Sequence, residues 1–364
     1  MKINMELFTN KLAKFKLSTL KLHFIRNPFY LLIALILFCS HDLYIKMETY
    51  FLQPNQEAIL SLYNGTFEKS ENIITRDRML DASMVSRGKR VAIKADQWTD
   101  KDTTITQLAF HTSEAATYVA GVSTKPRNIA LSADKFNDYL SHDGVVDMLE
   151  QRTKNNLLDQ DAVESYQKHV KAIYQVGDTN TEDWNTVLGY PIEFVPQANP
   201  YDKYSGDNLA VQLLLDGKPL SNQLVYADCL NSTHSHEAGH IKNEHSHEHE
   251  HDNGDHSHSH SSEGEESHTH TGGQQLRTND QGVFIVDLTK EGIYFLRSIY
   301  MTTVTDNDEL THRSKWATLT FEVSHRHDGS THTHSDAGGF PTWMFVVGSL
   351  LLVGLLFFAF RKKN

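Results

Sequence analysis

The chain lacks the cysteine pairs that would cross-link an exported fold. Of its 364 residues only Cys39 and Cys229 are cysteines, and Cys39 falls at the end of an apolar leader. Cys229 would stand alone once that leader is removed, so no disulfide is expected.

Excess positive charge is also missing. The sequence has 34 basic residues against 46 acidic ones, a formal net charge of -12. This balance argues against a nucleic-acid surface, since phosphate binding needs clustered Lys and Arg. Metal cations are the partners that such a charge favours.

The familiar catalytic motifs are absent from the sequence. It contains no G-x-S-x-G elbow, no H-E-x-x-H pair, no phosphate-binding glycine loop and no Cys/His nucleophile arrangement. No enzyme class is therefore indicated, and we expect a protein that is not an enzyme.

Long apolar runs occur only near the two ends. FYLLIALILFCS follows a basic region and is too short for a bilayer that needs about 20 apolar residues, so residues 1–40 are predicted to be a signal peptide. Residues 340–360 are long enough to span, and Arg361 to Lys363 follow them, which places the tail 361–364 in the cytoplasm. These signals predict a single-pass protein of a bacterial inner membrane with periplasmic domains. A lipid-modified Cys39 is the alternative at the leader, although Phe38 departs from the small residue expected there.

The remainder alternates between strand-like and helix-like patterns. NQEAILSLY, TITQLAF, TYVAGV and several later runs predict short strands, and Asp216-Gly217 suits a tight hairpin. Residues 133–175 are predicted to contain one or more helices, because Val163, Tyr166 and Val170 recur at helical spacing. In KWATLTFEV, alternate residues predict a strand with one face covered by a second sheet.

The predicted fold is mainly β, with two immunoglobulin-like β-sandwich domains, a helical segment between them and one C-terminal transmembrane helix. The expected divisions are a first sandwich at 41–132, a helical segment and connection at 133–186, a second sandwich at 187–325 with a histidine-rich insertion at 231–275, and a histidine-containing stalk at 326–339. Such an insertion costs little stability, because the entropy of loop closure grows slowly with length.

Several stretches resemble an exported family of unknown function. They are HDLYIK, the region from Phe136 to Leu157, ESYQKHVKAIYQVGD, GYPIEFVPQANPY, LLLDGKPL, TNDQGVFIVDL and KWATLTFEV. Relatives of that family include the extracytoplasmic metal-binding components of nickel and cobalt uptake systems. The resemblance implies paired immunoglobulin-like sandwiches and a mature chain that begins at His41. Tyr300 stands where relatives often carry a histidine, so the resemblance implies no ligand at that position.

His41 is the sharpest single candidate for a metal ligand. If the signal is cut after Ser40, His41 offers an imidazole and a free α-amine, two nitrogen donors that suit copper or nickel. Asp42 would add a carboxylate or orient the ring. The alternatives are a cut elsewhere, since Phe38 departs from the cleavage rule, and a residue that merely starts the first strand.

The histidine-rich insertion is the second metal signal. Its His-x-His pairs and interspersed carboxylates favour borderline-soft divalent ions, and their spacing fixes no single geometry, so several exchangeable ions are expected. The alternative is a solvated linker. The candidate ligands are His234, His236, His240, His245, His247, His249, His251, His256, His258, His260, His268 and His270.

Four further histidines, His111, His142, His169 and His312, are scattered and are expected to be ordinary surface or core residues.

The sequence as a whole predicts a membrane-anchored extracytoplasmic protein that binds nickel, cobalt or zinc, with copper also compatible. It would assist uptake or buffering beside a membrane metal permease. The alternatives are a copper-dependent oxidase or monooxygenase with an N-terminal histidine brace, which needs a second histidine from the fold, and a structural or adhesion module.

Overall fold

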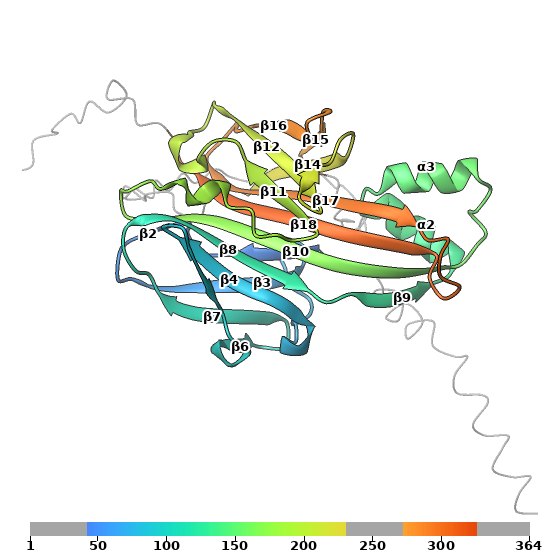
Figure 1. The fold of residues 1–364 in the computed structure, drawn as a ribbon, viewed down its shortest axis with the longest axis horizontal. Coiled ribbons are helices and arrows are strands. Elements are labelled where there is room, and N and C mark those ends of the chain that lie inside the picture. The colour runs from blue at the N-terminus through green and yellow to red at the C-terminus, as the bar shows by residue number, and fades with distance from the viewer. Residues whose placement is uncertain (1–41, 231–271, 326–364) are drawn as a thin grey trace, which may run out of the picture. The chain divides into compact units, whose positions relative to one another are not determined.

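The computed structural model describes residues 42–230 and 272–325, and these residues are mainly β-structure (Figure 1). The expected signal peptide, the metal candidate His41, the candidate histidines of the insertion, the stalk and the membrane helix lie outside this part of the chain. Within it, no helix is long and apolar enough to cross a membrane.

The strands form three sheets, and β10 runs through the middle of the largest one. The first four-stranded sheet has the order β1 (Asp42–Lys46), β3 (Glu57–Gly65), β7 (Ile105–His111) and β6 (Trp98–Lys101). The central ten-stranded sheet has the order β15 (Gln274–Arg277), β14 (Leu224–Leu230), β17 (Gly292–Thr303), β18 (His312–Val323), β10 (Ala162–Val176), β8 (Ala116–Thr124), β4 (Met79–Ser86) and β5 (Lys89–Ala92), with β2 (Phe51–Leu52) and β9 (Arg127–Leu131) also paired to β10. The third, four-stranded sheet contains β11 (Ile192–Pro196), β12 (Asn208–Leu215) and β13 (Lys218–Pro219), with β16 (Val283–Asp287) paired to β12.

Two α-helices and four short 3₁₀ helices complete the described structure. The α-helices are α2 (Ala133–His142) and α3 (Val146–Lys154), and the 3₁₀ helices are η1 (Arg76–Arg78), η2 (Ala95–Gln97), η3 (Glu182–Asn185) and η4 (Pro200–Asp202). Both α-helices pack with Trp316 and Ile299 of the central sheet in a small core of their own.

The two smaller sheets cover opposite faces of the central sheet, as Figure 1 shows for β3 and β7 on one side and β11 and β12 on the other. Strand β10 demonstrates this arrangement. Its residues Ala172 and Tyr174 belong to the core shared with the first sheet, whereas Ile173 between them belongs to the core shared with the third sheet. Successive side chains of a strand point to opposite faces, so β10 contributes to both cores.

The helix predicted over 133–175 is correct only in its first half. α2 and α3 occupy residues 133–154, but Val163, Tyr166 and Val170 lie on the strand β10. Every residue from Lys168 to Val176 is buried. A strand that is covered on both faces loses its alternating pattern, and apolar residues at helical spacing then arise within a continuous buried run.

The other predicted strands are confirmed, with one change at β18. Ala317, Leu319 and Phe321 face the third sheet as expected. The opposite face is buried too, because Thr318 Oγ1 and Thr320 Oγ1 donate hydrogen bonds to the backbone carbonyls of Leu43 and Ile45 in β1, at 2.7 and 2.8 Å. The polar alternation of this strand therefore reflects contact with another strand rather than with solvent.

The turns behave as the sequence suggests. Asp216 and Gly217 have φ values of 48° and 75° and connect β12 to β13, a conformation that Asp and Gly tolerate. The predicted insertion 231–275 ends slightly too late, since β15 already begins at Gln274.

A buried ion pair joins the central sheet to the third sheet. Lys171 of β10 and Glu193 of β11 are each 1% exposed at the side chain, with Nζ and Oε2 3.1 Å apart. Lys171 Nζ also donates to the carbonyls of Thr186 and Phe194 at 2.8 and 2.9 Å. Glu193 accepts from the backbone N–H groups of residues 188–190. All the strong polar groups of the pair are thus compensated, as burial of charge requires.

The substitution Lys171→Met is expected to destabilise the fold by about 3–5 kcal/mol, because it leaves the Glu193 carboxylate buried beside no cation. Lys154→Met is the matched control, since Lys154 pairs with Glu150 on an exposed helix face and should change stability by less than about 1 kcal/mol. Urea unfolding of both variants measures the difference. Equal effects of the two substitutions would contradict this role of the pair.

Candidate functional site

A cluster of buried charged side chains lies where β1 begins. Asp42, the first described residue, is only 2% exposed. Its Oδ2 atom accepts a hydrogen bond from the Tyr44 hydroxyl at 3.0 Å and lies 3.5 Å from Nε of Arg297. Burial, followed by the Asp42 charge, raises the pKa of Tyr44, so this phenol stays protonated and remains a donor.

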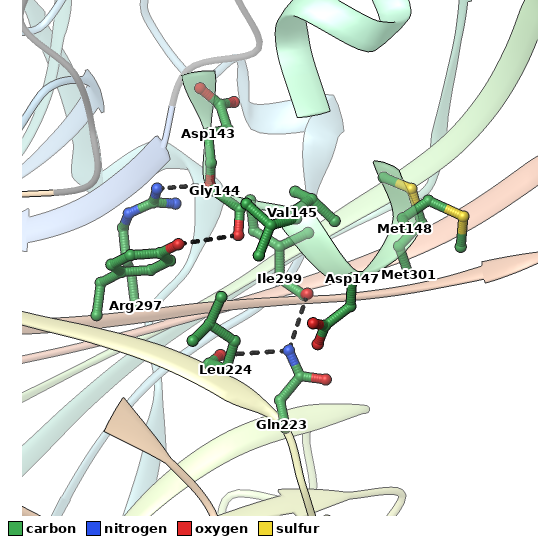
Figure 2. Close-up of a pocket in the computed structure, with 12 residues that line it drawn as sticks. Asp143, Gly144, Val145, Asp147, Met148, Gln223, Leu224, Arg297, Ile299 and Met301 are labelled. Atoms are coloured by element: carbon green, nitrogen blue, oxygen red, sulfur yellow. Dashed lines mark hydrogen bonds between the residues drawn. The ribbon is translucent and has the colours of Figure 1, made fainter. Parts of the chain in front are cut away.

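Arg297 connects the start of β1 to the end of helix α2. Its Nη2 donates to the backbone carbonyl of Asp143 at 2.6 Å, and its guanidinium stacks on the Tyr226 ring at 5.0 Å from the centroid. Tyr226 in turn donates to the carbonyl of Gly144 at 3.1 Å. Figure 2 shows Arg297 beside the Asp143–Gly144 turn. One buried cation therefore fixes two segments that are far apart in sequence.

Beyond Arg297, the cluster continues along β10. The carboxylate of Glu164 accepts hydrogen bonds from the hydroxyls of Ser314 and Tyr139. Burial raises the pKa of Glu164 to about 7 despite these two bonds. Lys168 lies four residues further along β10 and therefore on the same face as Glu164. It donates to Oδ1 of Asn64 at 2.8 Å, and burial lowers its pKa to about 8.

His142 and Asp143 form a hydrogen-bonded pair at the rim of this cluster. Nδ1 of His142 lies 2.8 Å from Oδ1 of Asp143. The Asp143 side chain is 3% exposed, whereas that of His142 is 30% exposed. The pair thus combines a buried carboxylate with an imidazole that reaches solvent. His142 is the last residue of α2, and Asp143 caps the helix.

The hollow next to Arg297 is small. Its volume is about 50 Å³, with Gln223, Leu224 and Ile299 in its wall, which is room for a water molecule or two. In Figure 2 the Asp143 carboxylate points away from Gln223 and Ile299. An organic substrate does not fit in this space.

A larger hollow, about 480 Å³, lies over the first sheet and is open to solvent. Lys46, Glu57, Tyr63 and Lys101 are among the residues that line it. Its charged residues are of both signs, and the Lys46 ammonium donates a hydrogen bond to the carbonyl of Phe67 at 3.0 Å. We find no convergent set of reactive groups in it.

Of the predicted metal ligands, one lies within the described residues and the others lie outside them. His41 and all twelve histidines of the insertion lie outside it, and their metal role stays a prediction. Asp42 lies inside it, with Oδ2 bound by Tyr44 and Arg297. Within residues 42–230 and 272–325, no group of three or more His, Cys, Asp or Glu side chains is arranged to hold a metal ion.

The scattered histidines differ from one another in the structure. His169 is buried and hydrogen-bonded through Nδ1 to Ser123 at 2.9 Å, and burial lowers its pKa to about 3. His312 is buried against Phe136 and bonded to Thr311, and burial lowers its pKa to about 4. Both are neutral core residues, as expected.

Sequence reasoning missed Arg297, Asp143, Glu164 and Lys168. Arg297 interrupts the apolar run of β17, and a buried charge requires a partner of opposite sign. That rule would have flagged Arg297, but it could not have named its partners, which come from β1 and from the end of α2. Lys168 lies among other polar residues of β10, so no local signal marks it.

A protein-family model matches most of the chain. The chain belongs to the family described as Domain of unknown function (DUF4198), which matches residues 39–302. No curated protein matches the chain. Among solved structures, it is similar to the D0-D1 domain of Intimin, at 8% identity over 77% of this chain and 97% of that chain with a TM-score of 0.17. It is also similar to a chimeric titin Z1Z2-Z1Z2 tandem, at 8% identity over 78% and 96% with a TM-score of 0.15. Scores this low do not define a common fold.

The buried carboxyl of Glu164 predicts a specific dependence of stability on pH. Its pKa is about 7 in the fold against an ordinary value of 4.5, so between these pH values the unfolded chain releases a proton that the folded chain keeps. Stability contributed by this group is complete below about pH 4.5 and is lost as pH rises to about 7.

Glu164→Gln should remove that component, so the free energy of unfolding of the variant should fall less than that of the wild type between pH 4.5 and 7. Urea titrations across this range measure the difference. Glu150→Gln, on the exposed face of α3, is the control and should follow the wild type. Parallel curves for Glu164→Gln and wild type would refute the shift.

Proposed function

We propose that the chain is an extracytoplasmic, membrane-anchored protein that binds divalent transition-metal ions and assists their uptake or buffering. Nickel, cobalt and zinc are the metals proposed, with copper also compatible, and a membrane metal permease is the proposed partner. The chain belongs to a family of unknown function, and the nickel and cobalt assignment rests on the sequence resemblance alone. The copper oxidase and the adhesion module stay predictions that no described contact favours.

The observation that carries the proposal is the fixed start of β1. Asp42 pairs in register with Gly65 and its carboxylate is held by Arg297 and Tyr44. The residue before it is His41, and neighbouring Cα atoms are about 3.8 Å apart. A histidine whose α-amine is free would therefore be attached to one of the most firmly held points of the fold, which favours a preorganised site.

The attachment of the insertion supports a separate, accessory role for it. β14 ends at Leu230 and β15 begins at Gln274, and the two strands pair from Leu224 with Arg277 to Ala227 with Gln274. The pairing is therefore made by residues on either side of the insertion. We propose that the insertion gathers ions and that a defined site near residue 41 holds one ion. The described part of the chain is further proposed to consist of two immunoglobulin-like sandwiches that share the central sheet.

The proposal requires a mature chain that starts at His41. N-terminal sequencing of the protein from the membrane fraction should give His-Asp-Leu-Tyr. A chain that starts at Met1, or a lipid-blocked Cys39, would eliminate the two-donor site.

Calorimetric titration with Ni²⁺ or Cu²⁺ should then show two classes of site. Replacing residues 231–271 by a Gly/Ser linker of equal length should abolish the many weak binding sites and leave about one site of high affinity. The melting temperature of the metal-free protein should stay the same. One alanine added ahead of His41 should remove the tight ion and spare the weak ones, because it displaces the amine. A tight ion that survives the added alanine, or that disappears with the insertion, would overturn the division of roles.

A further inference from the structure

We propose that the side chains of Lys168 and Asn64 join in a covalent amide bond, an intramolecular cross-link between the central sheet and the first sheet. This inference concerns a modification of the fold and is independent of the proposed metal binding. In a chain with only two cysteines, such a bond would supply the cross-link that disulfides provide in other exported proteins.

The first argument is the place of the two residues in the core. On β3, Leu62 belongs to the core between the first and central sheets, and Asn64 is the next residue on that face. On β10, Val170 belongs to the same core, and Lys168 is the neighbouring residue on that face. Each polar residue therefore continues an apolar row, and the two rows face each other across the core.

The second argument is contact between the reacting groups. Nζ of Lys168 lies 2.8 Å from Oδ1 of Asn64, and Oδ1 is bonded to Cγ, the carbon that an amine would attack. Lys168 is 5% exposed, and the rings of Tyr166 and Trp316 have their centroids 5.6 and 5.4 Å from Nζ. Two reactants held together in a fixed geometry react faster by orders of magnitude.

Burial also prepares the amine for the attack. It lowers the pKa of Lys168 from the ordinary value of 10.5 to about 8, although the charges of Asp42, Asp143 and Glu164 act in the opposite direction. A fraction of the amine is therefore neutral near pH 7. A neutral amine is the nucleophilic form, and hydrogen bonds that its N–H groups donate leave its lone pair in place.

The reaction balances without a co-reactant. A bond forms between Nζ of Lys168 and Cγ of Asn64, and the bond between Cγ and Nδ2 of Asn64 breaks. One proton moves from Nζ to Nδ2, which leaves as ammonia. No atom is oxidised or reduced, so the folded chain holds everything that the step needs.

The carboxyl group of Glu164 is the proposed carrier of that proton. Glu164 and Lys168 share one face of β10, and the charge of each acts on the pKa of the other. Burial raises the pKa of Glu164 to about 7, so both its forms are present near neutral pH, as a proton carrier requires. Its Oε2 atom has no hydrogen-bond partner among the described residues.

Peptide mass spectrometry of the full chain is the test. The purified protein is held at a pH of about 8, where much of the Lys168 amine is neutral, until its mass stops changing. Digestion should then give a branched peptide that contains both Asn64 and Lys168, with a mass one ammonia below the sum of its two parts. Lys168→Arg and Asn64→Ala should lack this peptide and should migrate more slowly on a denaturing gel, because a closed loop of 104 residues makes the cross-linked chain more compact.

Lys46→Arg is the matched control and should keep the cross-link, because Lys46 donates to a backbone carbonyl instead of a side-chain amide. Glu164→Gln should slow cross-linking by about 100-fold, the usual effect of losing a proton-transfer group, and an unchanged rate would remove Glu164 from the reaction. The wild-type chain decides the main inference, so a variant that fails to fold does not affect it. Recovery of Asn64 and Lys168 only in separate wild-type peptides, with Asn64 intact or converted to aspartate, overturns the cross-link and leaves the proposed function standing.

Discussion

The parallel pairing of β10 with β18 is the contact on which the rest of the structure depends. It joins nine residue pairs, from Glu164 with His312 to Ala172 with Thr320, and makes one sheet out of strands from both halves of the chain. Since a smaller sheet covers each face, this seam lies at the centre of the described structure. Each buried polar side chain on β10 and β18 therefore needs a hydrogen-bond or charge partner within the protein.

Those polar residues define the candidate site. Glu164 and Lys168 come from β10, Ser314 from β18 and Arg297 from the neighbouring β17. Their contacts with the start of β1 and with α2 bury the charged cluster instead of leaving it on a surface. Its rigidity follows from burial, because each charge is held by a neighbour in surroundings of low dielectric. A site built against it inherits that rigidity.

The strands and turns could be predicted from the sequence because their signals are local. Alternation gave most strands, and Asp216-Gly217 gave a turn that the structure confirms. β10 was mistaken for helix because its burial on two faces is a property of the tertiary structure. The cluster around Arg297 was missed for the same reason, as its members are brought together by sheet order, which no local pattern contains. Prediction also favoured histidines by their number, and it gave no weight to the contact between the His142 ring and the buried Asp143 carboxylate.

The position of β18 in the centre of the sheet also has a mechanical consequence. Tension applied to the chain beyond Ser324 would run along β18, whose hydrogen bonds to β10 and β17 lie across the direction of pull. Twelve residue pairs with β17 and nine with β10 would then have to slide together, in shear, instead of opening one after another like a zipper. The last strand of the described residues is thus arranged to resist a pull applied at its C-terminal end.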